Sequence, residues 1–126
     1  TNLSVSELMK KVCSGYAKFF NKTHEKTGSL FEHKFKAIAI DSDSYLVWLS
    51  SYIHQNPKVA GIVGDLNDWQ YSSYLDYLGK RNGKLCEKEI ILGQFKSSKD
   101  YEVFTNKSYQ KIKDRKDLQY LLLDEE

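Results

Sequence analysis

Apolar side chains recur every three or four residues in the first part of the chain, which is the spacing of an amphipathic helix. The pattern covers residues 4–21, and we predict a helix there that begins at Ser4 or Ser6 and buries its apolar stripe. The stripe consists of Val5, Leu8, Met9, Val12, Tyr16, Phe19 and Phe20. Cys13 lies near this stripe and is expected in the core.

Residues 30–40 are rich in β-branched and aromatic side chains and predict an extended strand. A single strand cannot satisfy its own backbone hydrogen-bonding groups. We therefore expect its neighbours in a preceding segment or in another copy of the chain.

Helical signals dominate the rest of the sequence. The run Asp41-Ser42-Asp43-Ser44 supplies cap candidates and negative charge for the start of a second helix, which Pro57 is expected to end near Asn56. We further predict a short helix that ends near Leu78 and a linker over residues 79–83. Three more short helices are expected near residues 87–95, 98–111 and 115–123. The fold class predicted is mainly α, with about five to six helices and one or two short strands.

Composition indicates one ordinary folded domain and argues against a multidomain enzyme. The chain has 126 residues, of which 40% are hydrophobic and 29% charged, with a single proline. No apolar stretch reaches the ~20 residues of a membrane helix, so we expect a cytoplasmic protein without membrane contact. Cys13 and Cys86 lie too far apart for a metal motif and are expected to be buried thiols. The chain opens on Thr1 directly before a helical pattern, and we expect a C-terminal piece of a larger protein.

Charge is distributed unevenly along the chain. Residues 1–40 carry seven lysines against three glutamates, whereas residues 41–80 carry five aspartates against two lysines. The C-terminal third, with ten basic and nine acidic residues, is a mixed surface. A modest basic patch in the first third is compatible with nucleic-acid binding and does not establish it.

The most informative chemistry lies on the second predicted helix. Tyr52 and Asn56 are four residues apart and share a helix face, while His54 points about 200° away from Tyr52. A phenol beside an amide oxygen suits a nucleophilic tyrosine that attacks a phosphodiester next to a divalent metal. Spacing alone favours a different interpretation, in which Tyr52 is a core aromatic residue near Trp48, Leu49 and Ile53 and Asn56 is a helix terminator before Pro57.

Four ordered motifs resemble the REP-associated tyrosine transposases, which belong to the HUH single-tyrosine transposases. The similarity begins in the first helix and covers roughly residues 12–79. Its motifs are Gly28-Ser29-Leu30-Phe31-Glu32-His33-Lys34-Phe35-Lys36, Asp41-Ser42-Asp43-Ser44-Tyr45-Leu46, Tyr52-Ile53-His54-Gln55-Asn56-Pro57-Lys58-Val59-Ala60-Gly61-Ile62-Val63 and Trp69-Gln70-Tyr71-Ser72-Ser73-Tyr74.

The resemblance implies that Tyr52 forms a 5′-phosphotyrosine with single-stranded DNA and that Asn56 helps to hold Mg²⁺ or Mn²⁺. The family's other metal ligands come from a His-hydrophobic-His motif on a sheet strand, which this sequence lacks. His24, His33 and His54 are too far apart to imitate that motif, and we expect them at the surface or beside the site. The implied parent fold is α+β, and the 126 residues alone are expected not to nick DNA.

Lysines near the motifs are candidate phosphate contacts. Where the family has Gly-His-Leu-Phe-Gln-Gly-Arg-Phe, this chain has Lys34 in place of the arginine, so a charge remains without the guanidinium fork. We predict that Lys34, Lys36 and Lys58 contact nucleic acid. Trp69, Tyr71 and Tyr74 are candidates for base stacking, and two of the three are expected to pack on the core.

We therefore expect residues 1–79 to be the C-terminal part of a transposase catalytic domain and residues 80–126 to be a variable helical extension. The expected partners are single-stranded DNA with hairpin structure and a weakly held second copy of the chain. Two alternatives remain open at this point. One is a non-catalytic hairpin or single-stranded DNA-binding protein derived from a transposase, and the other is a helical protein-interaction module.

Overall fold

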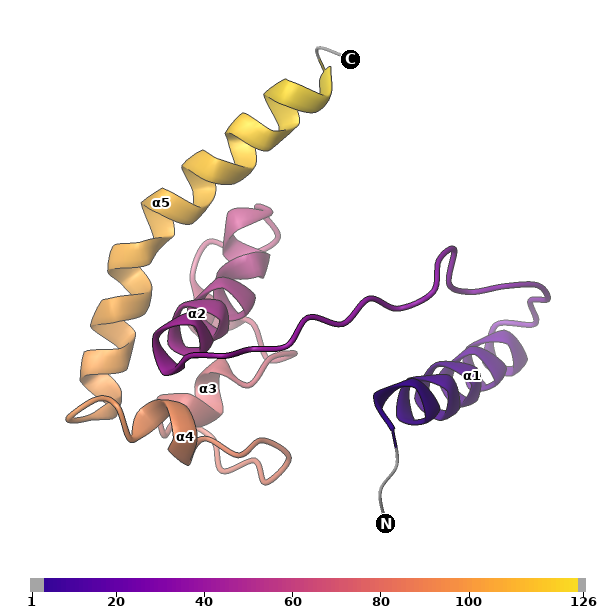
Figure 1. Ribbon diagram of the computed structural model, residues 1–126, viewed down its shortest axis with the longest axis horizontal. Helices are drawn as coiled ribbons and strands as arrows, with labels where there is room; N and C mark the ends of the chain where they lie inside the picture. The colour runs from indigo at the N-terminus through magenta and orange to yellow at the C-terminus, as the bar shows by residue number, and fades with distance from the viewer. Residues whose placement is uncertain (1–3, 125–126) are drawn as a thin grey trace. The chain divides into compact units, whose positions relative to one another are not determined.

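The chain folds into two compact units, Thr1–Ala39 and Ile40–Glu126, seen in Figure 1. The structure is a computed structural model that describes residues 4–124, with side chains as far as residue 116. Its elements are α1 (Val5–Thr23), α2 (Asp43–Val59), the 3-10 helix η1 (Leu66–Asp68), α3 (Tyr74–Tyr77), α4 (Glu89–Leu92) and α5 (Ser98–Asp124). The prediction of a mainly helical chain is confirmed, with five α-helices among the residues described.

The first unit contains α1 and the segment that follows it. Ser4 caps the helix, because its hydroxyl accepts a hydrogen bond from the Glu7 amide at 3.2 Å. The predicted burial of the apolar stripe is wrong within this unit, since α1 has no buried residue and Phe19 is 66% exposed. Residues 24–39 provide no layer broad enough to cover the stripe.

The strand predicted over residues 30–40 is wrong. The structure has no strand anywhere in residues 4–124, and this segment runs without regular secondary structure. Its β-branched and aromatic residues satisfy the local preference for a strand, but no neighbouring strand offers the backbone groups that a ladder requires. The predicted combination of helices with one or two strands, and with it the α+β class, is therefore replaced by a helical architecture for the residues described.

Helix α2 begins and ends at clear local signals. Ser42 caps its first turn by accepting from the Tyr45 amide at 3.2 Å. Pro57 lies inside the last turn instead of ending the helix at Asn56, and the helical hydrogen bonding resumes beyond its one missing donor, because the Ala60 amide donates to the Asn56 carbonyl at 2.9 Å. The helix stops at Gly61, whose φ of 77° lets the Gly61 and Ile62 amides donate to Lys58 and Pro57 carbonyls in a Schellman motif.

The second unit packs α2, η1, α3, α4 and α5 around one small core. The buried apolar residues that form this core are Val47, Leu66, Tyr74, Tyr77, Ile91 and Tyr101. The long helix α5 lies against α2, as Figure 1 shows. The sequence predicted two helices where α5 is continuous, and residues 98–124 contain neither the glycine nor the proline that would divide them.

Two further sequence predictions concern the environment of the chain. None of the helices in the described part combines the length and apolar character needed to cross a bilayer. Cys86 is exposed and Cys13 is half-buried, so the expectation of two buried thiols is wrong. Cys86 lies in the irregular segment before α4, where little packs over it.

Candidate functional site

Tyr52 and Asn56 lie one turn apart on one face of α2. Tyr52 is half-buried, and its ring stacks on that of Trp48 with the centroids 5.5 Å apart and the planes at 22°. Asn56 is exposed. We call the face that carries Trp48, Tyr52 and Asn56 the tyrosine face. Tyr52 thus combines the packing expected of a core aromatic residue with partial exposure.

Helix α5 brings two cations to the tyrosine face. The Lys116 ammonium donates a hydrogen bond to Oδ1 of Asn56 and lies 5.1 Å from the centroid of the Tyr52 ring. The Arg115 guanidinium lies 5.7 Å from the centroid of the Trp48 ring. Both distances are within the range of cation–π attraction. The amide predicted to hold a metal therefore has an ammonium group as its neighbour.

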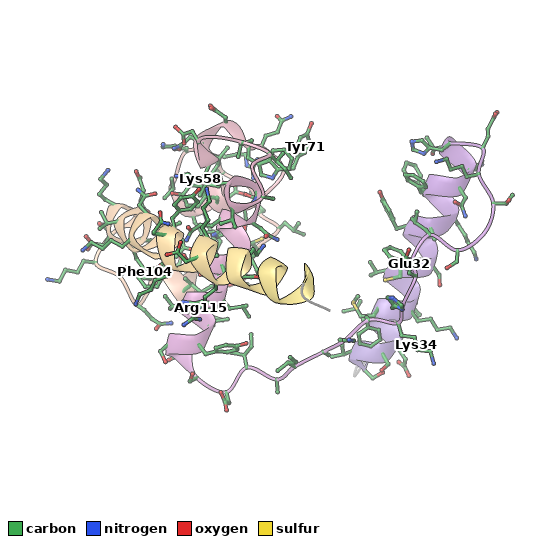
Figure 2. The ribbon with its side chains drawn as sticks, turned by 90° about the horizontal axis from the view of Figure 1, so that it is seen from above. Glu32, Lys34, Lys58, Tyr71, Phe104 and Arg115 are labelled. Atoms are coloured by element: carbon green, nitrogen blue, oxygen red, sulfur yellow. The ribbon has the colours of Figure 1, made fainter. Side chains whose placement is uncertain are left out.

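The three predicted lysine contacts are not brought together on a single element. Lys58 is on α2, half-buried, with its Nζ 4.2 Å from the centroid of the Tyr109 ring of α5. Lys34 and Lys36 belong to the first unit and are exposed. Lys34 lines a hollow beside α1 together with Met9 and Phe31. Figure 2 labels Lys34 in the first unit and Lys58 in the second.

The residues described do not by themselves fit a divalent metal ion. Side chains in residues 4–116 form no group of three or more His, Cys, Asp or Glu that could hold one. Asn56 offers a single amide oxygen, which already accepts from Lys116. A site of this kind needs several oxygen or nitrogen ligands around one ion, and Asn56 can supply only one of them.

The opposite face of α2 carries a buried polar cluster, which we call the histidine clasp. It consists of His54 and Ser50 of α2, Tyr101 of α5, and Ser73, which is the residue directly before α3. His54 Nδ1 lies 2.8 Å from the Tyr101 hydroxyl, and Nε2 lies 2.7 Å from the Ser73 hydroxyl. The Tyr101 hydroxyl also lies 3.0 Å from Ser50 Oγ. His54 is 3% exposed, so the expectation of a surface histidine is wrong, although it does point away from Tyr52.

Donor accounting assigns a direction to the hydrogen bonds of Ser50 and Tyr101 in the clasp. Ser50 donates its only hydroxyl hydrogen to the Val47 carbonyl at 2.7 Å, so it can only accept from Tyr101. Tyr101 in turn accepts from His54 Nδ1–H. The neutral ring then accepts at Nε2 from the Ser73 hydroxyl. The accounting therefore requires a proton on Nδ1, and the lowered pKa of His54 leaves Nε2 without one, so that it accepts from Ser73.

Burial tunes the acid–base behaviour of the clasp. Removal from water disfavours the imidazolium and lowers the pKa of His54 from 6.5 to about 4. The same effect raises the pKa of Tyr101 to about 12. Both groups are thus uncharged at neutral pH, and the clasp holds α2, α3 and α5 together without titrating.

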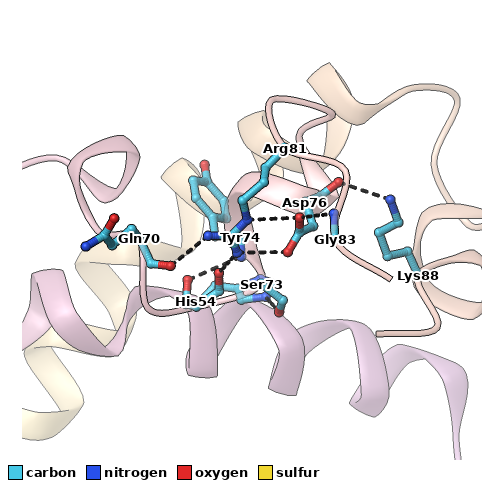
Figure 3. Close-up of polar contacts among 9 residues, drawn as sticks. His54, Gln70, Ser73, Tyr74, Asp76, Arg81, Gly83 and Lys88 are labelled. Carbon is cyan, nitrogen blue, oxygen red and sulfur yellow. Dashed lines mark hydrogen bonds and ion pairs between the residues drawn. The ribbon is translucent and has the colours of Figure 1, made fainter. Parts of the chain in front are cut away.

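A second polar cluster positions Ser73 for the clasp. Arg81 binds the Asp76 carboxylate with Nε at 3.0 Å and Nη2 at 2.8 Å, and it also donates to the Gln70 and Ser72 carbonyls. The Gly83 amide donates to the same carboxylate at 2.8 Å. Figure 3 shows these bonds beside His54 and Ser73. The Arg81 hydrogen bond is the main reason that the pKa of Asp76 falls to about 2.

Sequence reasoning missed the contributions of α5 to both faces of α2. Lys116, Arg115 and Tyr101 lie at least 47 residues from their α2 partners, so no local pattern connects them. One signal was present: Ser50 and His54 are four residues apart, which places two polar groups on one helix face. Of the three aromatic residues near α3, Tyr74 is buried, Trp69 is half-buried and Tyr71 is 74% exposed.

Comparisons with protein-family models, with curated proteins and with solved structures returned no match to this chain.

Proposed function

We propose that this chain is the tyrosine-bearing part of a transposase that cuts and rejoins single-stranded DNA near hairpins. The observation that carries the proposal is the arrangement on α2, where Tyr52 and Asn56 share a partly exposed face one turn apart. Cations of α5 lie against the same face, and positive charge is what a phosphodiester attacked by a phenol would require. The resemblance of the motif around Tyr52 to the family supports the same assignment.

The proposed step exchanges one phosphodiester for another. The Tyr52 oxygen attacks a backbone phosphorus and loses its proton to solvent, while the bond from phosphorus to the 3′-oxygen breaks. The departing 3′-oxygen takes up a proton, leaving a free 3′-hydroxyl and a 5′-phosphate joined to Tyr52. Because the number of ester bonds is unchanged, the reverse attack reseals the strand without a nucleotide cofactor.

The proposal requires groups that the 126 residues do not contain. A histidine pair from another segment would complete the site, and Mg²⁺ or Mn²⁺ belongs to that complete enzyme, with Asn56 as one ligand. The chain alone is proposed to be inactive in cleavage. Residues 1–79 would form the C-terminal part of the catalytic domain, and residues 80–126 would be its extension.

Partners and location follow from the same proposal. Weak self-association is supported by the apolar side chains of α1, because Leu8, Val12 and Phe19 are each more than half exposed. Single-stranded DNA with hairpin structure is the proposed substrate. A cytoplasmic location suits an enzyme that acts on bacterial-type DNA elements.

The test is the formation of a covalent DNA adduct. The protein encoded by the whole gene is incubated with a hairpin-flanked oligonucleotide and Mn²⁺, and adducts are resolved on a denaturing gel. We expect Tyr52→Phe to abolish the adduct while oligonucleotide binding is retained. Tyr45→Phe, an exposed tyrosine on the same helix, is the matched control and should leave the adduct unchanged.

Other outcomes separate the alternatives. Binding that is unaffected by Tyr52→Phe, with no adduct from either protein, would favour a non-catalytic DNA-binding protein. No salt-dependent binding of single-stranded DNA would favour a protein-interaction module. Cleavage through Tyr52 by the 126 residues alone would overturn our account of how the site is completed.

A further inference from the structure

Basic and aromatic side chains alternate where α5 crosses the tyrosine face of α2. We call this the basic–aromatic surface. It is formed by Trp48, Tyr52, Lys58, Tyr109, Arg115 and Lys116. Only Tyr52 and Lys58 of this set were singled out by the sequence. Figure 2 labels Lys58 on α2 and Arg115 on α5.

Each aromatic ring of the surface has a cation against it. Lys58 lies 4.2 Å from the Tyr109 centroid, Lys116 lies 5.1 Å from that of Tyr52, and Arg115 lies 5.7 Å from that of Trp48. The rings restrict the long side chains and hold their charges at the surface. A ligand that binds there meets cations that are already partly ordered, which lowers the entropy lost on binding.

The positive charge of this part of α5 is only weakly offset nearby. Residues 107–117 contain five basic residues and two acidic residues, Asp114 and Asp117. Among the side chains described, the carboxylates within ion-pair distance of a basic group belong to other pairs, and Lys58, Arg115 and Lys116 have none. The surface therefore has charge available for an anionic partner.

We propose that the basic–aromatic surface binds the backbone of single-stranded DNA and leads the strand to Tyr52. This inference rests on the proposed function and adds residues of α5 to the DNA-binding site. Alternating cations and aromatic rings suit a single strand, because its phosphates can draw the cations off the rings and its unpaired bases can then stack on the ring faces that become free. A duplex offers the phosphates but not the bases.

Lys116 is the residue that links strand binding to the reacting position. Its ammonium is hydrogen-bonded to a neutral amide oxygen of Asn56. A phosphate oxygen attracts the ammonium more strongly than the amide oxygen does, because the phosphate carries a full negative charge and the amide is neutral. A bound strand therefore places a phosphate next to Lys116 and within one helical turn of Tyr52.

The experiment measures binding of a fluorescent single-stranded oligonucleotide to the full 126-residue chain by anisotropy over a series of salt concentrations. The test variant is Arg115→Ala/Lys116→Ala. The matched control is Lys107→Ala/Lys111→Ala, which removes the same charge from exposed positions of α5 outside the basic–aromatic surface. Circular dichroism and melting temperature establish that each variant is folded. Lys116→Arg keeps the positive charge and tests whether charge at this position is enough to maintain binding.

We expect the test variant to bind ~10-fold more weakly and to lower the salt-dependence slope by about 1.4, the value for two phosphate contacts on a single strand. The affinity of the control variant for the oligonucleotide should stay within about twofold of that of the parent chain. Lys116→Arg should retain affinity. Binding of the parent to a duplex of the same sequence should be weaker, and polyglutamate should compete poorly.

Several results would overturn the inference. If the two double variants weaken binding equally, or if polyglutamate competes as well as DNA, the surface is a general polyanion patch and only this inference fails. If the parent chain binds no oligonucleotide at all, the proposed DNA-related function fails with it. Equal affinity for single strand and duplex would remove the role assigned to the aromatic rings.

Discussion

The two faces of α2 carry polar groups in contrasting environments. On one face, His54 and Ser50 are buried, and each hydrogen-bonding atom has a partner in the histidine clasp. On the tyrosine face, Tyr52 is half-buried and Asn56 is exposed, and their neighbour is the ammonium of Lys116. The same helix thus has a closed polar face and an accessible one.

The difference distinguishes polar groups of α2 that stabilise the fold from polar groups that are free to contact a ligand. Groups that are fully satisfied by one another hold helices together and leave nothing for a ligand. A phenol, an amide and a cation that are partly exposed can exchange their contacts for a substrate. His54 is chemically versatile, yet its burial and its hydrogen bonds make it a structural residue, whereas Tyr52 is partly exposed.

The largest expected effect is on stability and comes from the closed face. Tyr101→Ala removes a fully buried ring that packs against His54, Tyr77 and Phe95. We expect the free energy of unfolding to fall by about 3–5 kcal/mol, measured by urea denaturation. Tyr52→Ala should cost only about 1 kcal/mol because its ring is half-buried. Equal losses would contradict the distinction between the faces.

The second-largest expected effect is a loss of stability in acid, caused by protonation of His54 in the histidine clasp. Because the pKa of His54 is about 4 in the folded protein and 6.5 when unfolded, the unfolded chain binds a proton first. Stability is therefore full above pH 6.5 and falls between pH 6.5 and 4, by about 3 kcal/mol in total. The lowered pKa of Asp76 acts below this window, since its contribution is lost only as pH falls from 3.8 to about 2. A His54→Gln variant should show a flatter profile between pH 6.5 and 4, and an unchanged profile would contradict the assignment.

A smaller effect is expected at the end of α2. Gly61→Ala places a side chain at a φ of 77° and should reduce the free energy of unfolding by about 1 kcal/mol. Gly64→Ala is the matched control, because Gly64 has no positive φ and no atom within 4 Å of an added Cβ. Thermal melts of the two variants measure the difference, and equal melting temperatures would argue against the Schellman motif.

The smallest stability effect is expected on the tyrosine face. Lys116→Met removes the ammonium near Tyr52 and Asn56 and keeps a long apolar side chain. We expect a loss of no more than ~1 kcal/mol, the value of an exposed cation–π contact. Urea denaturation of this variant checks it. A loss as large as that from Tyr101→Ala would mean that Lys116 is part of the core and not of an accessible surface.

Local sequence signals predicted much of the second unit. A cap of α2 among residues 41–44, the helix face shared by Tyr52 and Asn56, and a short helix ending near Leu78 were predicted from residues within a few positions of one another. The boundary at Pro57 was placed too early, because a proline in the last turn is compatible with helix.

Features that depend on partners distant in the chain could not be predicted. Residues 30–40 have the composition of a strand, but composition does not supply a neighbour, and in residues 4–124 no strand forms. The burial of His54 depends on Tyr101 and Ser73, which other elements bring to it. The cations on the tyrosine face come from α5, about 60 residues away. The predicted roles of Tyr52, Asn56, Lys34, Lys36 and Lys58 stay predictions.

The most direct measurement of the central claim is the fluorescence of Trp48 during titration with single-stranded DNA. In a Trp69→Phe chain, Trp48 is the remaining tryptophan, and it lies on the tyrosine face stacked on Tyr52. If DNA binds at that face, Trp48 emission should be quenched saturably as DNA is added. The DNA concentration at half-maximal quenching should equal the binding midpoint from anisotropy, and added salt should reverse the quenching. Saturable DNA binding that leaves Trp48 emission unchanged would place the strand elsewhere and contradict the account.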